Sequence, residues 1–134
     1  MHPYTSAELA RKLQRTATGL LSAEAAVDLL IGHGAWLARE DFVHGFIDVA
    51  TDPFQRGHEQ VAAVRWEAAT GAVKAGRLVC SGSEAAMLSI AASLAAGITV
   101  DLRETLGGLD AANLALVLKA LARANGRAVQ VRVR

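Results

Sequence analysis

The sequence has few residues that form covalent or metal cross-links, and few aromatic residues. Cys80 is its one cysteine in 134 residues, which excludes an internal disulfide and a cluster of metal-binding thiolates within the chain. Phe, Trp and Tyr make up only 4% of the residues, whereas alanine is abundant. Because helices favour alanine and strands favour branched and aromatic side chains, the composition predicts a mainly α fold.

Long apolar runs are also lacking. The longest uncharged run, Ala85 to Val100, is rich in alanine and serine and is interrupted by Gly97, so it is too short and too small-sided for a membrane span. The first 21 residues carry charges where a signal peptide has its apolar centre. We therefore expect a cytoplasmic protein without a membrane partner. The length fits one helical domain over residues 1–134.

Acidic residues are absent from the C-terminal end. Every Asp and Glu lies at or before Asp110, and the five cations after it are Lys119, Arg123, Arg127, Arg132 and Arg134. The segment 39–59 leans acidic, through Glu40, Asp41, Asp48, Asp52 and Glu59. Such an uneven charge bears on partners rather than on the fold, and the basic end is a candidate surface for an acidic partner or for phosphate.

The stretch "LVCSGSEAAML" at residues 78–88 predicts the start of a central helix. Ser81 and Glu84 have the spacing of a capping box, in which each side chain binds a backbone N–H group at the helix start. After Glu84 the helical pattern carries no charge and is apolar or small all round, which is typical of a buried helix. We predict a single bundle of about six helices around this central helix, 84–96.

The remaining elements follow from caps, glycines and periodicity. We expect one helix to start at Thr5 and a second to run from Ser22 to a stop at Gly32–Gly34. Further helices are expected over 38–48, 66–75 and 101–106. A last helix begins at Asp110 and ends at Asn125–Gly126. Residues 51–57 are predicted to form a loop. The core face of the last helix is predicted to contain Leu114, Val117, Leu118 and Leu121.

The C-terminal residues alternate with period two, which predicts a strand over 128–133. A strand needs a partner. The segment 60–65 of the same chain is the first choice, and another subunit is the second. The fold class is therefore mainly α with at most a short two-stranded β element.

The sequence offers two candidates for a metal-binding or catalytic site. Asp41, His44 and Asp48 would share one face of a helix over 38–48, where carboxylates and an imidazole could bind a metal, although a solvated polar face is the favoured interpretation. Cys80 precedes a helix start and could be a reactive thiolate, although a structural role is favoured. We expect no catalytic residue, no metal and no cofactor.

The segments Ser81–Gly97, Val100–Arg103 and Gly108–Leu114 resemble a group of small uncharacterised actinobacterial proteins, and a fainter likeness extends over 29–46. The low lysine content and abundant alanine are typical of proteins from GC-rich genomes. That group has no known function, so the resemblance implies no activity or ligand.

The leading hypothesis for function is a non-enzymatic protein-interaction module that binds a protein partner or itself as a homo-oligomer. One alternative is a nucleic-acid-associated protein that uses the basic C-terminal helix and strand, although that end lacks aromatic residues for base stacking. Another alternative is a metal- or thiol-dependent enzyme that uses Asp41, His44 and Asp48, or Cys80.

Overall fold

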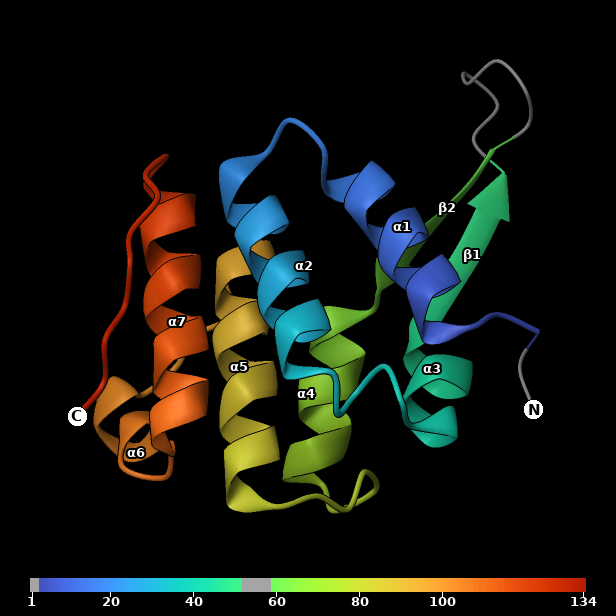
Figure 1. Ribbon diagram of the computed structural model, residues 1–134. Coiled ribbons are helices and arrows are strands. Elements are labelled where there is room, and N and C mark those ends of the chain that lie inside the picture. The colour runs from blue at the N-terminus through green and yellow to red at the C-terminus, as the bar shows by residue number, and fades with distance from the viewer. Residues whose placement is uncertain (1–2, 52–58) are drawn as a thin grey trace.

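Two helices rich in alanine lie side by side at the centre of the structure (Figure 1). This computed structural model describes residues 3–51 and 59–134. Helix α2 (Leu21–His33) buries Ala25 and Ala26, and helix α5 (Gly82–Ala96) buries Ala91 and Ala92. Small side chains allow two helices to approach closely. The predicted buried helix over 84–96 is thus confirmed, and α2 shares the centre with it.

The α2–α5 pair separates two apolar clusters. The first lies among α1 (Ser6–Ala17), α2, α3 (Glu40–Phe46) and α4 (Trp66–Lys74), with Trp36 and Phe42 fully buried in it. The second lies among α2, α5 and α7 (Ala111–Ala124) and contains Leu29 and Met87. Leu30 of α2 and Leu88 of α5 belong to the first cluster. The two central helices therefore bury side chains on both sides.

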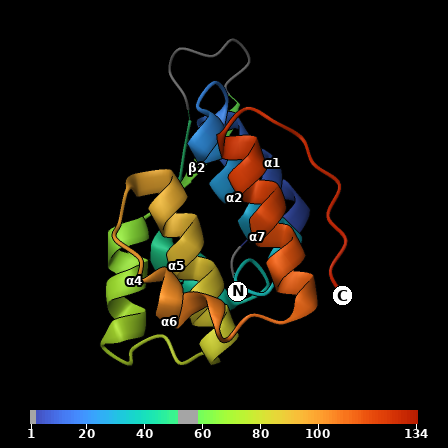
Figure 2. The ribbon, with the colours of Figure 1, turned by 90° about the vertical axis from the view of Figure 1, so that its left-hand side faces the viewer.

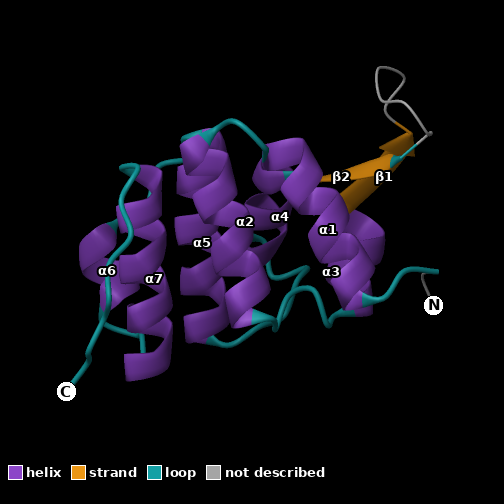
Figure 3. Cartoon of the chain, turned by 45° about the horizontal axis from the view of Figure 1, so that its top comes forward, coloured by secondary structure: helices purple, strands orange, loops and turns teal. Residues whose placement is uncertain are grey.

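The predicted fold class, mainly α with a small β element, is confirmed. The described residues form seven helices, of which α6 (Leu102–Leu106) is the shortest, and one two-stranded sheet. The sheet, α1 and α3 lie at one side of the molecule, and α7 and the C-terminal residues lie at the other (Figures 1 and 3). Among the described helices, none combines the length and the apolar character needed to cross a bilayer.

The strand pairing differs from the prediction. Strand β2 (Gln60–Val64) pairs antiparallel with β1 (Ile47–Thr51), and residues 128–133 form no strand. The helix predicted over 38–48 ends at Phe46 instead. The missed signal is the alternation of Ile47, Val49 and Thr51, because β-branched side chains at every second position favour a strand. The predicted loop over 51–57 lies outside the described residues apart from Thr51, which ends β1.

The core face of α7 is also rotated from the prediction. Val117 is buried as expected, but Leu118 and Leu121 are 40% and 48% exposed. Ala120, which was not predicted to be in the core, is buried in the same cluster as Ala25 and Ala26 of α2. The leucine pattern failed because α7 packs on α2 through small side chains, which leaves the larger leucines to one side.

The capping box at the start of α5 is confirmed. The Ser81 hydroxyl accepts a hydrogen bond from the backbone N–H of Glu84 at 3.1 Å, and the Glu84 carboxylate accepts one from the backbone N–H of Ser81 at 2.9 Å. The indole N–H of Trp36 donates to the backbone carbonyl of Glu84 at 2.9 Å. This first turn therefore ties α5 to the connection between α2 and α3.

Replacing Ala91 with leucine tests the close packing at the centre. Ala91 has no exposed surface, so the added carbon atoms force neighbouring side chains apart, and Ala91→Leu should lower the free energy of unfolding by about 1–3 kcal/mol. The same change at exposed Ala96 should alter it by less than about 0.5 kcal/mol. Urea unfolding followed by circular dichroism measures both. Equal losses in the two variants would contradict the packing described.

Glu84→Gln tests the capping box through pH. The hydrogen bond from the Ser81 backbone N–H holds the pKa of Glu84 below its ordinary value. The carboxylate therefore stabilises the fold above its unfolded-state pKa of about 4.3, and this contribution is lost as the pH falls through the lowered folded-state pKa. Wild type should exceed the variant in unfolding free energy at neutral pH, and the difference should close in acid. A constant difference across a pH series would argue against it.

Candidate interaction surface at the C-terminal end

The three residues predicted to share a metal-binding helix face are divided, because Asp41 and His44 lie on α3 and Asp48 does not. Because α3 ends at Phe46, Asp48 lies in β1, where it pairs with Arg65 at 3.5 Å. Asp41 pairs with Arg39 at 2.6 Å, and the hydrogen bond from Arg39 lowers the pKa of Asp41. Across residues 3–51 and 59–134, no three His, Cys, Asp or Glu side chains are placed to hold a metal ion.

Cys80 lies half-buried in the connection between α4 and α5 and packs against the first apolar cluster. Burial raises the pKa of the Cys80 thiol, the nearby charge of Glu84 raises it further, and Arg39 opposes both effects. A raised pKa reduces the thiolate fraction, which is the reactive form. The surroundings of Cys80 therefore suit a packing role.

His33, in the last turn of α2, carries the one buried side-chain nitrogen or oxygen atom in the described part of the chain that has no hydrogen-bond partner, its Nδ1. Burial lowers the pKa of His33, and the charges of Glu84 and Asp110 act in the opposite direction. The lowered pKa favours the neutral form of this imidazole.

The predicted basic residues do come together, along α7 and the C-terminal segment, residues 127–134. This segment runs beside α7 over its length (Figures 1 and 2). The 14 residues of α7 rise about 21 Å. Eight residues cover that distance only when they are nearly extended, at about 3.3 Å each. The segment thus has the shape of a strand without the pairing of one.

No backbone hydrogen bond joins residues 128–134 to any other described residue; the last one in the chain is donated by Arg127 to the carbonyl of Ala122. Val131 and Val133 are half-buried against the body of the protein, whereas Val129 is 47% exposed. The exposure of the side chains therefore follows the predicted alternation over residues 131–134 but not at Val129, and the predicted strand partner is absent from the described residues.

Two hollows flank the C-terminal segment, and Lys119 and Val129 line both. The first is a cavity of about 320 Å³ between α2, α7 and the start of the segment. It is lined by Asp28, Leu29, Leu116, Lys119, Ala120, Arg123, Arg127, Ala128 and Val129. The second, shallower hollow of about 600 Å³ is lined by Lys119, Val129, Gln130, Val131 and Arg132. We call the two together the C-terminal groove.

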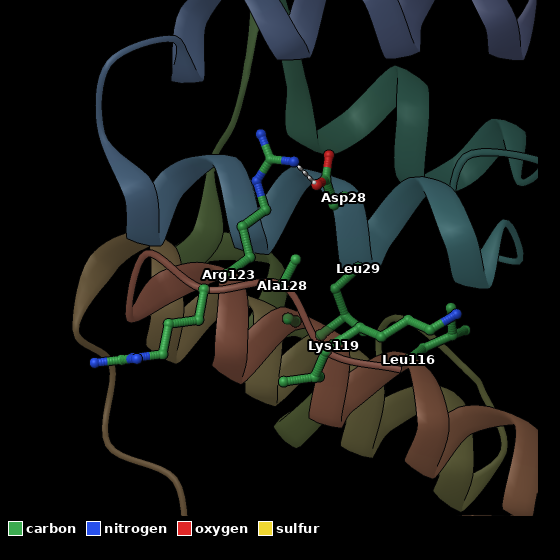
Figure 4. Close-up of a pocket in the computed structure, with 9 residues that line it drawn as sticks. Asp28, Leu29, Leu116, Lys119, Arg123 and Ala128 are labelled. Atoms are coloured by element: carbon green, nitrogen blue, oxygen red, sulfur yellow. Dashed lines mark ion pairs between the residues drawn. The ribbon is translucent and has the colours of Figure 1, made fainter. Parts of the chain in front are cut away.

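Arg123 holds α7 against α2 at one edge of the groove. Its guanidinium contacts Asp28 at 2.7 Å and Glu24 at 3.3 Å, and Figure 4 shows it turned towards Asp28 while Lys119 extends away from it. Burial raises the pKa of Asp28, which Arg123 opposes and Glu24 reinforces. Glu24 and Asp28 lie one turn apart, so they repel each other unless a cation lies between them. Arg123 is therefore engaged within the chain.

The other cations of the groove have no ion pair within the described residues. Lys119, Arg127 and Arg132 are exposed, as is Arg134 beyond the groove, and the Arg127 side chain donates to the side chain of Asn125. In contrast, the described acids of the segment 39–59 have intrachain partners. Besides the Asp41 and Asp48 pairs, Glu59 lies 3.5 Å from Arg15. The acidic middle is thus largely neutralised, while the basic end is not.

The acids and the apolar walls of this surface were not predicted. Glu24 and Asp28 have i, i+4 spacing on α2, a signal that two carboxylates share a helix face. Buried Leu29 of α2 and half-buried Leu116 of α7 form apolar walls of the cavity. Among the described residues, further large apolar side chains exposed at this end of the chain are Leu102, Leu106, Leu118 and Leu121. Of the predicted cations, only Arg134 lines neither hollow.

No family model, curated protein or solved structure matches this chain.

Arg123→Gln tests the contact between α7 and α2. The change leaves Glu24 and Asp28 facing each other without a cation and should lower the free energy of unfolding by about 0.5–1 kcal/mol, the range for partly exposed ion pairs. Salt should shrink the loss by screening the two carboxylates. Arg127→Gln, which removes a neighbouring charge without an ion pair, is the matched control and should be neutral. Urea unfolding at low and high salt decides between these outcomes.

Proposed function

We propose that this protein is a non-enzymatic protein-interaction module that binds another protein through the C-terminal groove. The observation that carries the proposal is the C-terminal segment itself, a strand-patterned stretch with unpaired backbone groups beside two hollows. An extended segment of this kind can recognise another polypeptide through main-chain hydrogen bonds, with neighbouring pockets to select side chains.

The charge distribution supports a different protein as the partner over a second copy of the chain. Attraction between copies would need available acids in the segment 39–59, but Asp41, Asp48 and Glu59 are paired with arginines of their own chain. The cations Lys119, Arg127 and Arg132 remain available at the groove. We place the protein in the cytoplasm, where a lone cysteine stays reduced.

Charge reversal in the groove tests this function. The tagged double variant Lys119→Glu/Arg132→Glu should lose a protein that co-purifies in fixed ratio with wild type from the native cell, because both changes repel the acidic partner. The double variant Arg11→Glu/Arg103→Glu reverses two exposed cations on α1 and α6 and should retain that protein. Mass spectrometry identifies what is bound, and light scattering of the purified chain measures self-association.

Three outcomes would contradict the proposal. Retention of the same protein by the groove variant would place its binding elsewhere. Nuclease-sensitive nucleic acid in place of a protein would support the alternative of nucleic-acid association. A salt-sensitive homo-oligomer that is lost in the groove variant would make the partner a second copy.

A further inference from the structure

We infer that the partner presents an extended acidic segment with alternating aliphatic residues, and that this segment binds as a strand alongside residues 128–134. The inference deepens the proposed function and rests on it. Three properties of the C-terminal groove carry it: its main-chain groups, its charge and its apolar cavity.

The main-chain groups of the C-terminal segment are suited to strand addition. The segment is nearly extended, lies at the surface, and has no backbone hydrogen bond from 128 onwards within the described structure. Val129, Val131 and Val133 alternate with Gln130, Arg132 and Arg134. An incoming strand could pair with one edge while its own side chains follow the same alternation.

The charge of the groove selects an acidic strand. Lys119 lines both hollows, Arg127 lines the cavity and Arg132 lines the outer hollow, and none of the three has an ion pair with a described residue. Arg123 is held by Glu24 and Asp28 and adds little to the field. Exposed cations attract acidic groups over about 10 Å at moderate salt. Carboxylates at alternate positions of the incoming strand would face them.

The cavity selects an aliphatic or aromatic side chain at the intervening positions. Its walls include Leu29, Leu116, Ala120 and Val129. An apolar cavity of about 150 Å³ is enough to bind benzene, so about 320 Å³ has room for a large apolar side chain. Burial of that side chain would add hydrophobic stabilisation to the charge pairs at the rim.

The same features disfavour nucleic acid as the occupant. Single strands bind through bases stacked on aromatic side chains, and no aromatic residue lines either hollow. The apolar side chains on the cavity wall offer phosphate no hydrogen bonds. An unpaired strand-like segment recognises a polypeptide backbone, which a nucleic acid lacks.

Fluorescence anisotropy with defined peptides tests the inference on the whole chain. The probe is a fluorescein-labelled peptide of alternating glutamate and leucine, kept dilute. It should bind wild type, and added salt should weaken the binding. A peptide with lysine in place of glutamate, and one with proline at every third position, should bind at least about tenfold more weakly. A single-stranded oligothymidylate is the competing probe.

Three variants locate the bound peptide. Lys119→Glu/Arg132→Glu should weaken binding about tenfold, whereas Arg11→Glu/Arg103→Glu should leave it unchanged. Ala128→Phe places a ring at the cavity that the peptide side chain would occupy, and should also weaken binding. Thermal unfolding of each variant establishes that it is folded, and a variant that is not folded is replaced by the single changes Lys119→Gln and Arg132→Gln.

The outcomes separate this inference from the proposed function. If the native partner is lost in the groove variant but no acidic peptide binds, the interaction module stands and the acidic strand is wrong. If the proline and lysine peptides bind as tightly as the acidic one, strand addition and charge selection are both overturned. Tighter binding of oligothymidylate would overturn the choice of a polypeptide.

Discussion

The contact between α2 and α5 is the constraint on which the rest of the structure depends. Both helices carry apolar or small side chains on nearly all faces. Each must therefore be covered by other elements on two sides. The larger cluster, with Trp36 and Phe42, covers one side of the pair. Helix α7 covers the other side with a much smaller cluster. The capping box at Ser81 and the Trp36 hydrogen bond fix where α5 begins relative to α2.

The way α7 is attached explains why the C-terminal groove lies at this end. Its buried face uses Val117 and Ala120, which bring it close to α2 but fill little volume. The larger Leu118 and Leu121 stay at the surface, and the chain turns back after Gly126 to run beside the helix. Arg123 adds a polar tie to Glu24 and Asp28. The C-terminal segment then covers α7 incompletely, and the cavity is the space left between them.

Local signals in the sequence predicted the fold class, the central helix and most helix ends. Ser81, Glu84 and the uncharged run that follows them specify α5 because cap and burial are properties of neighbouring residues. The pairing of 60–64 was not predictable in the same way. It depends on which of two strand-like segments, 47–51 or 128–133, lies beside 60–64 after folding. In the folded chain Ile47 and Val49 pair with residues of Gln60–Val64, whereas Val129 and Val131 do not. The cations of the groove were predicted from the distribution of charge along the sequence. Its walls and the partners of Arg123 were not predicted, because they come from three separate elements.

Within the described structure, residues 128–134 form no backbone hydrogen bond, and this affects how the protein can change over generations. No backbone hydrogen bond joins helices α1 to α7 to residues 128–134, and Arg132 and Arg134 are exposed to solvent. Substitutions at Arg132 and Arg134 leave the packing of the bundle almost unaltered. Selection can therefore change the charge at this end of the groove without a compensating change in the core. Arg123, only a few positions earlier, forms ion pairs with α2 and has far less freedom to vary.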